Sequence, residues 1–159
     1  MPTDAAFEEA LDRFSRELGT LSGSMLLLKA HLHIETAIIV ALSELFPNAA
    51  ALPKRLGCDT RISLLEAFGA RPEFLRPYRK LGTFRNDLAH KLEFEFDDQK
   101  MEEFFSTFQG VQRDKWQESI VRHTPPAGGD LGNTDKFKLA IISLWAATYA
   151  LPRHLTHSA

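Results

Sequence analysis

The sequence has little of what disulfide-stabilised and cysteine-based metal proteins use. It contains one cysteine, Cys58, in 159 residues, so it can form no intrachain disulfide and no zinc site built on cysteines. Neither sign of charge dominates, because 19 Lys and Arg stand against 21 Asp and Glu. This balance argues against a protein coated with positive charge for nucleic acid, but it allows a local basic patch.

The sequence also lacks long apolar runs. The longest, such as AIIVAL, are far shorter than the roughly 20 residues that a membrane span needs. The first residues, MPTDAAFEEALDRF, are acidic and amphipathic, without the basic and apolar regions of a signal peptide. We therefore expect a soluble protein with no membrane segment, located in the cytoplasm.

Apolar residues recur every three or four positions from Phe7 to Phe46, which predicts two amphipathic helices. The turn between them is expected at GTLSGS, and Pro47 is expected to end the second helix. We expect this stripe to face the core. It consists of Phe7, Leu11, Phe14, Leu18, Leu21, Met25, Leu28, Leu32, Glu35, Ile39, Leu42 and Phe46.

The middle of the chain predicts two further helices. Asp59 or Thr60 is expected to cap a helix that stops at Gly69. A short turn from Pro72 is then expected to precede a longer helix from about Pro77 to Lys91.

The C-terminal half also predicts helices, with one extended segment before them. EFEFDD alternates with period two and is expected to be extended, after which Asp97 or Asp98 caps a helix with inward phenylalanines. A short helix with Trp116, the loop TPPAGGDLGNTD and a last helix capped by Thr134 or Asp135 complete the chain. We predict one all-α domain, residues 1–159, a compact antiparallel bundle of about five to seven helices.

The segment KLGTFRNDLAHKL combines a helical pattern with unusual polar residues. Residues 71–91 hold six basic and two acidic residues, a net charge of +4 in a chain of net charge −2. Such a concentration suits a phosphate-binding surface, although it also fits an ordinary solvated face. The basic side chains expected to contact RNA are Arg76, Arg79, Lys80 and Lys91.

Arg85 and His90 are five residues apart in this segment. On an ideal helix that spacing separates them by about 140° around the axis and roughly 7.5 Å along it. They can meet if the helix frays near His90 or if the long arginine side chain wraps around it. They can also meet if a second copy of the chain brings its own pair to a shared cleft, and a homodimer through this helix is the simplest of these arrangements.

Glu35 is the one charged residue in the apolar stripe. A carboxylate at a buried position needs an ionic partner, and Arg85 is the partner that we expect because its planar guanidinium can bind a carboxylate with two hydrogen bonds. His31, one turn earlier, would join this cluster. The alternative is that Glu35 lies at the edge of the stripe and reaches water. His31 and Glu35 are too few ligands for a metal site, and the sequence predicts no metal and no cofactor.

Arg85, His90 and the polar Asn86 directly after the arginine resemble the Arg-x4-6-His signature of the HEPN superfamily. The helix LKAHLHIETAIIVAL and the layout of residues 20–110 are similar to the mannitol-repressor-like branch of that superfamily. The resemblance implies an antiparallel helical bundle that dimerises with the motif in the dimer cleft. Toxins paired with a nucleotidyltransferase antitoxin often have a tyrosine two residues after the histidine, where this chain has Leu92.

The resemblance implies a metal-independent endoribonuclease, a toxin or phage-defence effector with an antitoxin protein as a partner. Arg85 and His90 would be catalytic, with Asn86, Glu35 and His31 in support. Histidine can exchange a proton near neutral pH, and arginine can stabilise the crowded phosphate while the 2′-hydroxyl attacks. The products would be a 2′,3′-cyclic phosphate and a 5′-hydroxyl. The alternative is a non-catalytic HEPN module that binds a protein or nucleotide partner, because the repressor-like branch keeps much of the motif without an established nuclease role.

Overall fold

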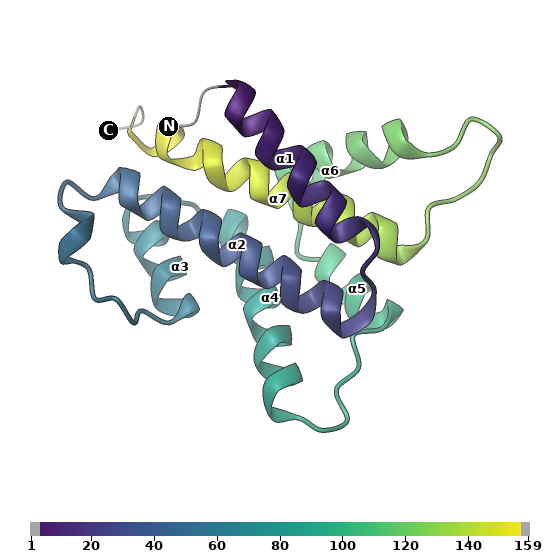
Figure 1. The fold of residues 1–159 in the computed structure, drawn as a ribbon, viewed down its shortest axis with the longest axis horizontal. Helices are drawn as coiled ribbons and strands as arrows, with labels where there is room; N and C mark the ends of the chain where they lie inside the picture. Colours follow the sequence, from purple (N-terminus) through teal and green to yellow (C-terminus); the bar gives the residue numbers. More distant parts are fainter. Residues whose placement is uncertain (1–3, 157–159) are drawn as a thin grey trace.

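The fold is an all-α bundle, as the sequence predicts. The computed structural model describes residues 4–156, and within that range it contains seven α-helices and no strand (Figure 1). The helices are α1 (Asp4–Gly19), α2 (Gly23–Leu45), α3 (Cys58–Ala67), α4 (Pro72–His90), α5 (Asp98–Phe105), α6 (Gly110–His123) and α7 (Asn133–Thr156), with a short 3-10 helix, η1 (Ala49–Ala51), after α2.

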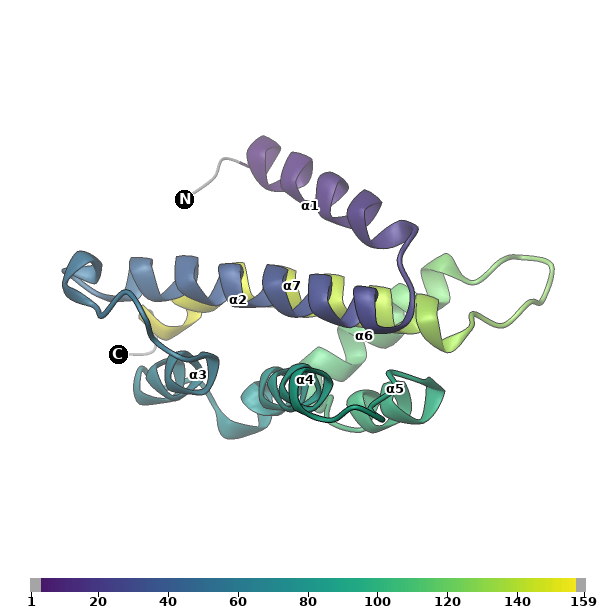
Figure 2. The same ribbon diagram turned by 60° about the horizontal axis from the view of Figure 1, so that its bottom comes forward.

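Two long helices, α2 and α7, form the middle layer of the bundle. Figure 2 shows them side by side, with α1 on one side of this layer and α3, α4 and α5 on the other. Helix α2 packs against α1, α3, α4 and α7, and α7 also packs against α5 and α6. The C-terminal end of α4 projects from the bundle, at the bottom of Figure 1.

The stripe predicted for the core is correct in α1 and wrong in most of α2. Phe14, Leu18 and Leu42 are buried, but the positions that continue the stripe through α2 are largely exposed. The exposed residues, named here the α2 stripe, are Met25 at 56%, Leu28 at 41%, Leu32 at 54% and Ile39 at 45%. The face that α2 buries instead contains Leu26, Leu27, Ala30, Ile34, Ala37, Ile38 and Ala41.

Helix α2 is apolar on nearly every side. By length and composition it is the one helix within residues 4–156 that could cross a membrane, and half of its most apolar window is buried in the bundle. Four other helices pack against it and its alanine-rich face is buried, so α2 is the central core helix of this structure.

Glycine and aspartate fix several helix ends where the sequence predicts them. Helix α3 ends before Gly69, whose φ of +102° is in the left-handed region that glycine favours. Its last carbonyls are satisfied because the N–H groups of Gly69 and Ala70 donate to Glu66 and Leu65, the pattern of a Schellman motif. The side chain of Asp97 caps α5 by accepting a hydrogen bond from the Lys100 N–H at 2.9 Å.

Other boundaries differ from the prediction. Helix α3 begins at Cys58 with Gly57 as its N-cap, so Asp59 lies within the first turn instead of capping it. Helix α4 is one continuous helix from Pro72, with Pro77 buried inside it, and the turn predicted between these prolines is absent. Pro77 removes one helical hydrogen bond near the start of α4, where the loss is small beside the apolar burial of the same turns.

Adjacent leucines of α2 provide a test of which face is buried. Leu27 is fully buried and Leu28 is 41% exposed. We expect Leu27→Ala to lower the free energy of unfolding by about 2–5 kcal/mol, because it leaves a cavity in the core. The matched change Leu28→Ala is expected to cost less than about 1 kcal/mol. Urea denaturation of both variants measures the difference, and equal losses would contradict the orientation of α2.

Candidate functional site

Helix α4 presents its polar motif to solvent. Arg85, Asn86 and His90 are all exposed, and the Arg85 guanidinium donates a 3.3 Å hydrogen bond to the Asn86 side-chain oxygen. Because α4 is helical through His90, Arg85 and His90 lie on different sides of the same helix, about 140° apart. One chain therefore does not bring the two residues to a common point.

Glu35 has a different partner from the one that the sequence predicts. It accepts a hydrogen bond from the guanidinium of Arg61 in α3, and not from Arg85. The Arg61 side chain is 14% exposed and that of Glu35 is 26% exposed, so water screens this pair only in part. The idea that Glu35 needs an arginine is correct, but Arg61 lies closer to it because α3 packs directly on α2.

His31 and Arg85 belong to the same cluster as this ion pair. The His31 side chain is buried, and burial lowers its pKa. Glu35 raises that pKa and Arg85 lowers it, so both charges are near the imidazole ring. The half-buried Cys58 thiol, whose pKa burial raises to about 11, is influenced by Glu35, Arg61 and Arg85 as well. We call His31, Glu35, Arg61 and Arg85 the polar cluster.

The basic residues expected to contact RNA have different surroundings. Arg76 is exposed, Arg79 pairs with Glu66 at 2.6 Å, and Lys91 pairs with Asp87 at 2.8 Å. Lys80 donates to Glu103 at 2.9 Å and lies 4.7 Å from the centre of the Phe84 ring. Hydrogen bonds from Lys100 and Lys80 lower the pKa of Glu103 to about 2, which keeps this carboxylate charged. Three of the four basic side chains must therefore leave an acidic partner to bind phosphate.

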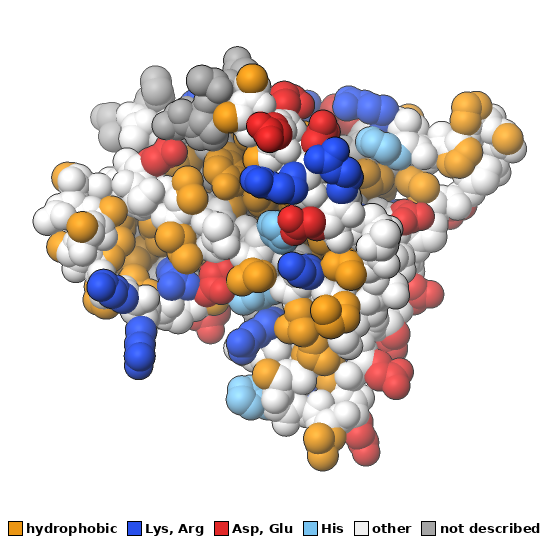
Figure 3. All heavy atoms as spheres, viewed as in Figure 1, with side chains coloured by type: hydrophobic (Ala, Val, Ile, Leu, Met, Phe, Trp, Pro, Cys, Tyr) orange, Lys and Arg blue, Asp and Glu red, His pale blue; other side chains and the backbone are white. Residues whose placement is uncertain are grey.

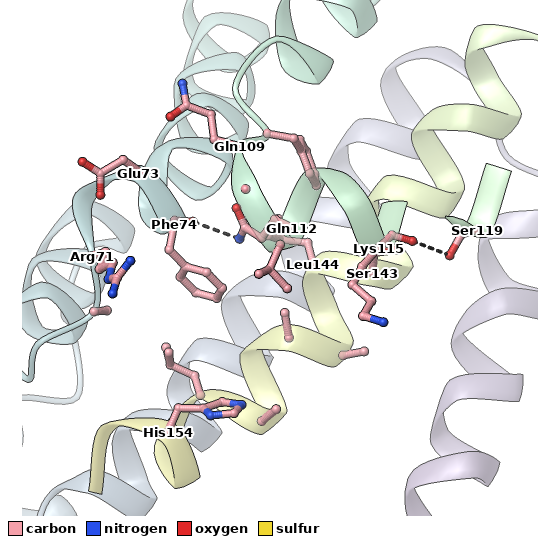
Figure 4. Close-up of a pocket in the computed structure, with 18 of the residues that line it drawn as sticks. Arg71, Glu73, Phe74, Gln109, Gln112, Lys115, Ser119, Ser143, Leu144 and His154 are labelled. Carbon is pink, nitrogen blue, oxygen red and sulfur yellow. Dashed lines mark hydrogen bonds between the residues drawn. The ribbon is translucent and has the colours of Figure 1, made fainter. Parts of the chain in front are cut away.

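A groove lies elsewhere, between α4, α6 and α7 (Figure 4). Its volume is about 1060 Å³, and alanines of α7 form part of its wall. Gln112 donates to the Phe74 carbonyl at 3.0 Å across it, while its other amide atom, Oε1, is buried without a partner. Neither the polar cluster nor His90 lines this groove, so the motif and the groove are separate features.

The α2 stripe borders the polar cluster. Figure 3 shows orange apolar side chains gathered over α2 and the projecting end of α4, beside blue basic and pale blue histidine side chains. On α2, His31 and Glu35 occupy the boundary between the buried face and the α2 stripe. This face of the monomer therefore combines uncovered apolar area with the residues of the motif.

Comparison of the chain with protein-family models, with curated protein sequences and with solved structures finds no match. Within residues 4–156, no group of three or more histidine, cysteine, aspartate or glutamate side chains is arranged to hold a metal ion. The case for a function therefore comes from the polar cluster, the motif of α4 and the surface around them.

The identity of the Glu35 partner is testable with a double-mutant cycle. Glu35→Gln and Arg61→Met are expected to be coupled by about 1 kcal/mol, because a partly buried ion pair is lost in either single variant. Glu35→Gln and Arg85→Met are expected to show coupling near zero in the same urea denaturation experiments. Coupling to Arg85 that exceeds coupling to Arg61 would restore the arrangement expected from the sequence.

Proposed function

We propose that this chain is a HEPN-type, metal-independent endoribonuclease that acts as a homodimer in the cytoplasm. The observation that carries the proposal is that α4 presents the arginine and histidine of the motif to solvent, beside an uncovered apolar stripe. An exposed arginine can bind a phosphate, and an exposed histidine can exchange a proton near neutral pH. The cell would hold such an activity in check, for example with an antitoxin protein.

A homodimer would let an arginine and a histidine of the motif reach the same phosphate. In one chain Arg85 and His90 point to different sides of α4, so one small target cannot touch both. A two-fold contact that covers the α2 stripe and the projecting end of α4 would place His90 of the partner subunit near Arg85. The same contact would remove from water the exposed side chains Met25, Leu28, Leu32 and Ile39.

The reaction then needs two events at one phosphate. The 2′-hydroxyl of the RNA loses its proton and attacks the neighbouring phosphorus, while the 5′-oxygen leaves and takes up a proton. Arg85 would stabilise the charge on the phosphate oxygens, and His90 would exchange a proton at the site. The chain breaks into a 2′,3′-cyclic phosphate and a 5′-hydroxyl, and DNA is not cut because it lacks the attacking hydroxyl.

A second candidate function is a non-catalytic module that binds a protein or a nucleotide. The ion pairs of Arg79, Lys80 and Lys91 favour it, because they occupy most of the positive charge that an RNA backbone would need. In this case the polar cluster is structural, and the protein has no turnover to lose.

The two functions differ in a cleavage assay. Purified protein is incubated with total RNA or tRNA in excess EDTA, beside Arg85→Ala, His90→Ala and a DNA control. We expect the wild type to cut RNA, and each variant to lose about 10²-fold to 10⁴-fold in rate. Both residues are exposed, so their thermal melts should remain close to wild type. Intact RNA with well-folded wild-type protein would favour the binding module, and two fully active variants would refute the site.

The dimer contact is tested by placing a charge in the α2 stripe. Leu32 is 54% exposed, and we expect Leu32→Asp to convert the dimer into a monomer in light scattering, because two buried carboxylates would oppose each other across the contact. Val121→Asp in α6 is the matched control, since Val121 is 75% exposed and outside the α2 stripe. A wild-type monomer, or a dimer that survives Leu32→Asp, would contradict this contact.

A further inference from the structure

The connection between η1 and α3 carries two basic side chains that the fold does not use. Lys54 and Arg55 are exposed, and neither forms an ion pair or a side-chain hydrogen bond with any residue from 4 to 156. No contact inside the chain therefore competes for their charge, and both are available to an anionic ligand.

The basic residues that the sequence predicts for RNA binding are in the opposite situation. Arg79, Lys80 and Lys91 each have a carboxylate partner within 2.9 Å. To bind a phosphate, each of them must give up that ion pair, whereas Lys54 and Arg55 have none to give up. The unpaired cations are thus the better phosphate ligands, although they lie outside the basic segment of α4.

The start of α3 lies against α4, one turn before Arg85. Gly82 is buried in α4, and a Cβ atom on it would lie 4.0 Å from the Asp59 carboxylate oxygen in the first turn of α3. Arg85 follows Gly82 by three residues, which places it about 60° around the helix and about 4.5 Å further along the axis. The exposed Arg85 therefore emerges from α4 beside the start of α3.

The length of the connection keeps Lys54 and Arg55 close to the same place. Arg55 precedes Asp59 by four residues, and four residues span at most about 14 Å even when fully extended. In Figure 1 this blue connection runs below α2 to the start of α3, which lies beside α4. Lys54, Arg55 and Arg85 are thus close enough for one short RNA strand to contact all three.

The charges on this surface favour an anion. Glu35 is balanced by its hydrogen-bonded ion pair with Arg61. Asp59 adds one negative charge, and the three unpaired cations outnumber it. Figure 3 shows blue side chains along this edge of the molecule, with red ones between them. Exposed cations in such an arrangement attract the phosphates of a nucleic acid backbone.

We propose that Lys54 and Arg55 bind backbone phosphates of the RNA strand that Arg85 holds at the point of cleavage, an inference that rests on the proposed ribonuclease activity. The strand would leave the motif of α4, cross the start of α3 and follow the connection to η1. The connection between α2 and α3 is then part of the substrate-binding surface, and it fixes the direction in which the RNA leaves the site.

Contacts of this kind act on binding and not on the chemical step. Lys54 and Arg55 would contact phosphates next to the reacting one, and those phosphates do not change during the reaction. Such contacts stabilise the bound substrate and the transition state equally. Their loss therefore raises KM and leaves kcat unchanged, while the loss of Arg85 lowers kcat.

The test compares two double variants of the full chain in cleavage of a short single-stranded RNA. We expect Lys54→Gln/Arg55→Gln to raise KM about 10-fold with kcat close to wild type. The control, Arg113→Gln/Arg122→Gln, removes the same charge from exposed positions of α6 and should keep the wild-type KM.

A binding measurement separates this inference from the catalytic proposal. The Kd for 2′-O-methyl RNA, which cannot be cut, is measured by fluorescence anisotropy over a range of salt concentrations. We expect Lys54→Gln/Arg55→Gln to reduce the slope of log Kd against log salt by about 1.4, since each phosphate contact on a single strand contributes about 0.7. The α6 control should keep the wild-type slope.

The outcomes are distinct. Cleavage with unchanged KM and salt slope in Lys54→Gln/Arg55→Gln would overturn the role of these residues and leave the ribonuclease in place. Binding without cleavage, with the expected loss in the variant, would refute the ribonuclease and keep the RNA surface. A wild type that neither binds nor cuts RNA would overturn both.

A conservative variant tests whether charge at these positions is what matters. Lys54→Arg/Arg55→Lys keeps both charges on exposed side chains, so it should keep the wild-type KM and salt slope. A KM that rises as much in this variant as in Lys54→Gln/Arg55→Gln would show an effect on the connection itself and would overturn the assignment.

Discussion

The close packing of α2 on α7 is the constraint on which the rest of the structure depends. Ala30, Ala37 and Ala41 lie on the buried face of α2, and side chains this small let a neighbouring helix approach closely. This contact fixes the rotation of α2 about its own axis. That rotation in turn puts His31 and Glu35 at the boundary between core and solvent, where α3 and α4 bring Arg61 and Arg85 to them.

Much of the fold can be read from local signals. Three helix ends depend on local residues, so they can be predicted without knowing how the helices pack. They are the break at Gly19–Gly23, the stop at Gly69 and the Asp97 cap. The rotation of α2 cannot be read in this way. Its sequence is apolar on most sides. The turn before α2 also interrupts the helical periodicity, so the buried stripe of α1 does not predict which face of α2 is buried. Which leucines of α2 are buried depends on which of its apolar faces packs against α7.

Some residues of the candidate site can be predicted from the sequence, and others depend on how the helices pack. Arg85 and His90 stand out because their spacing on one helix is local information. The partner of Glu35 depends on where three helices meet, and no spacing along the chain encodes that.

The unsatisfied oxygen of Gln112 has a consequence for how the molecule fluctuates. Helix α6 buries one residue, Trp116, whose indole N–H donates to the Lys136 carbonyl at 3.0 Å, and it packs mainly on α7. With a buried amide oxygen left unpaired at its start, we expect α6 to be held less firmly than α2 or α7. Backbone amides of α6 should therefore exchange with solvent deuterium well before those of the central pair. The polar cluster contains no residue of α6, so we expect such an opening to leave the ion pair of Glu35 and Arg61 in place.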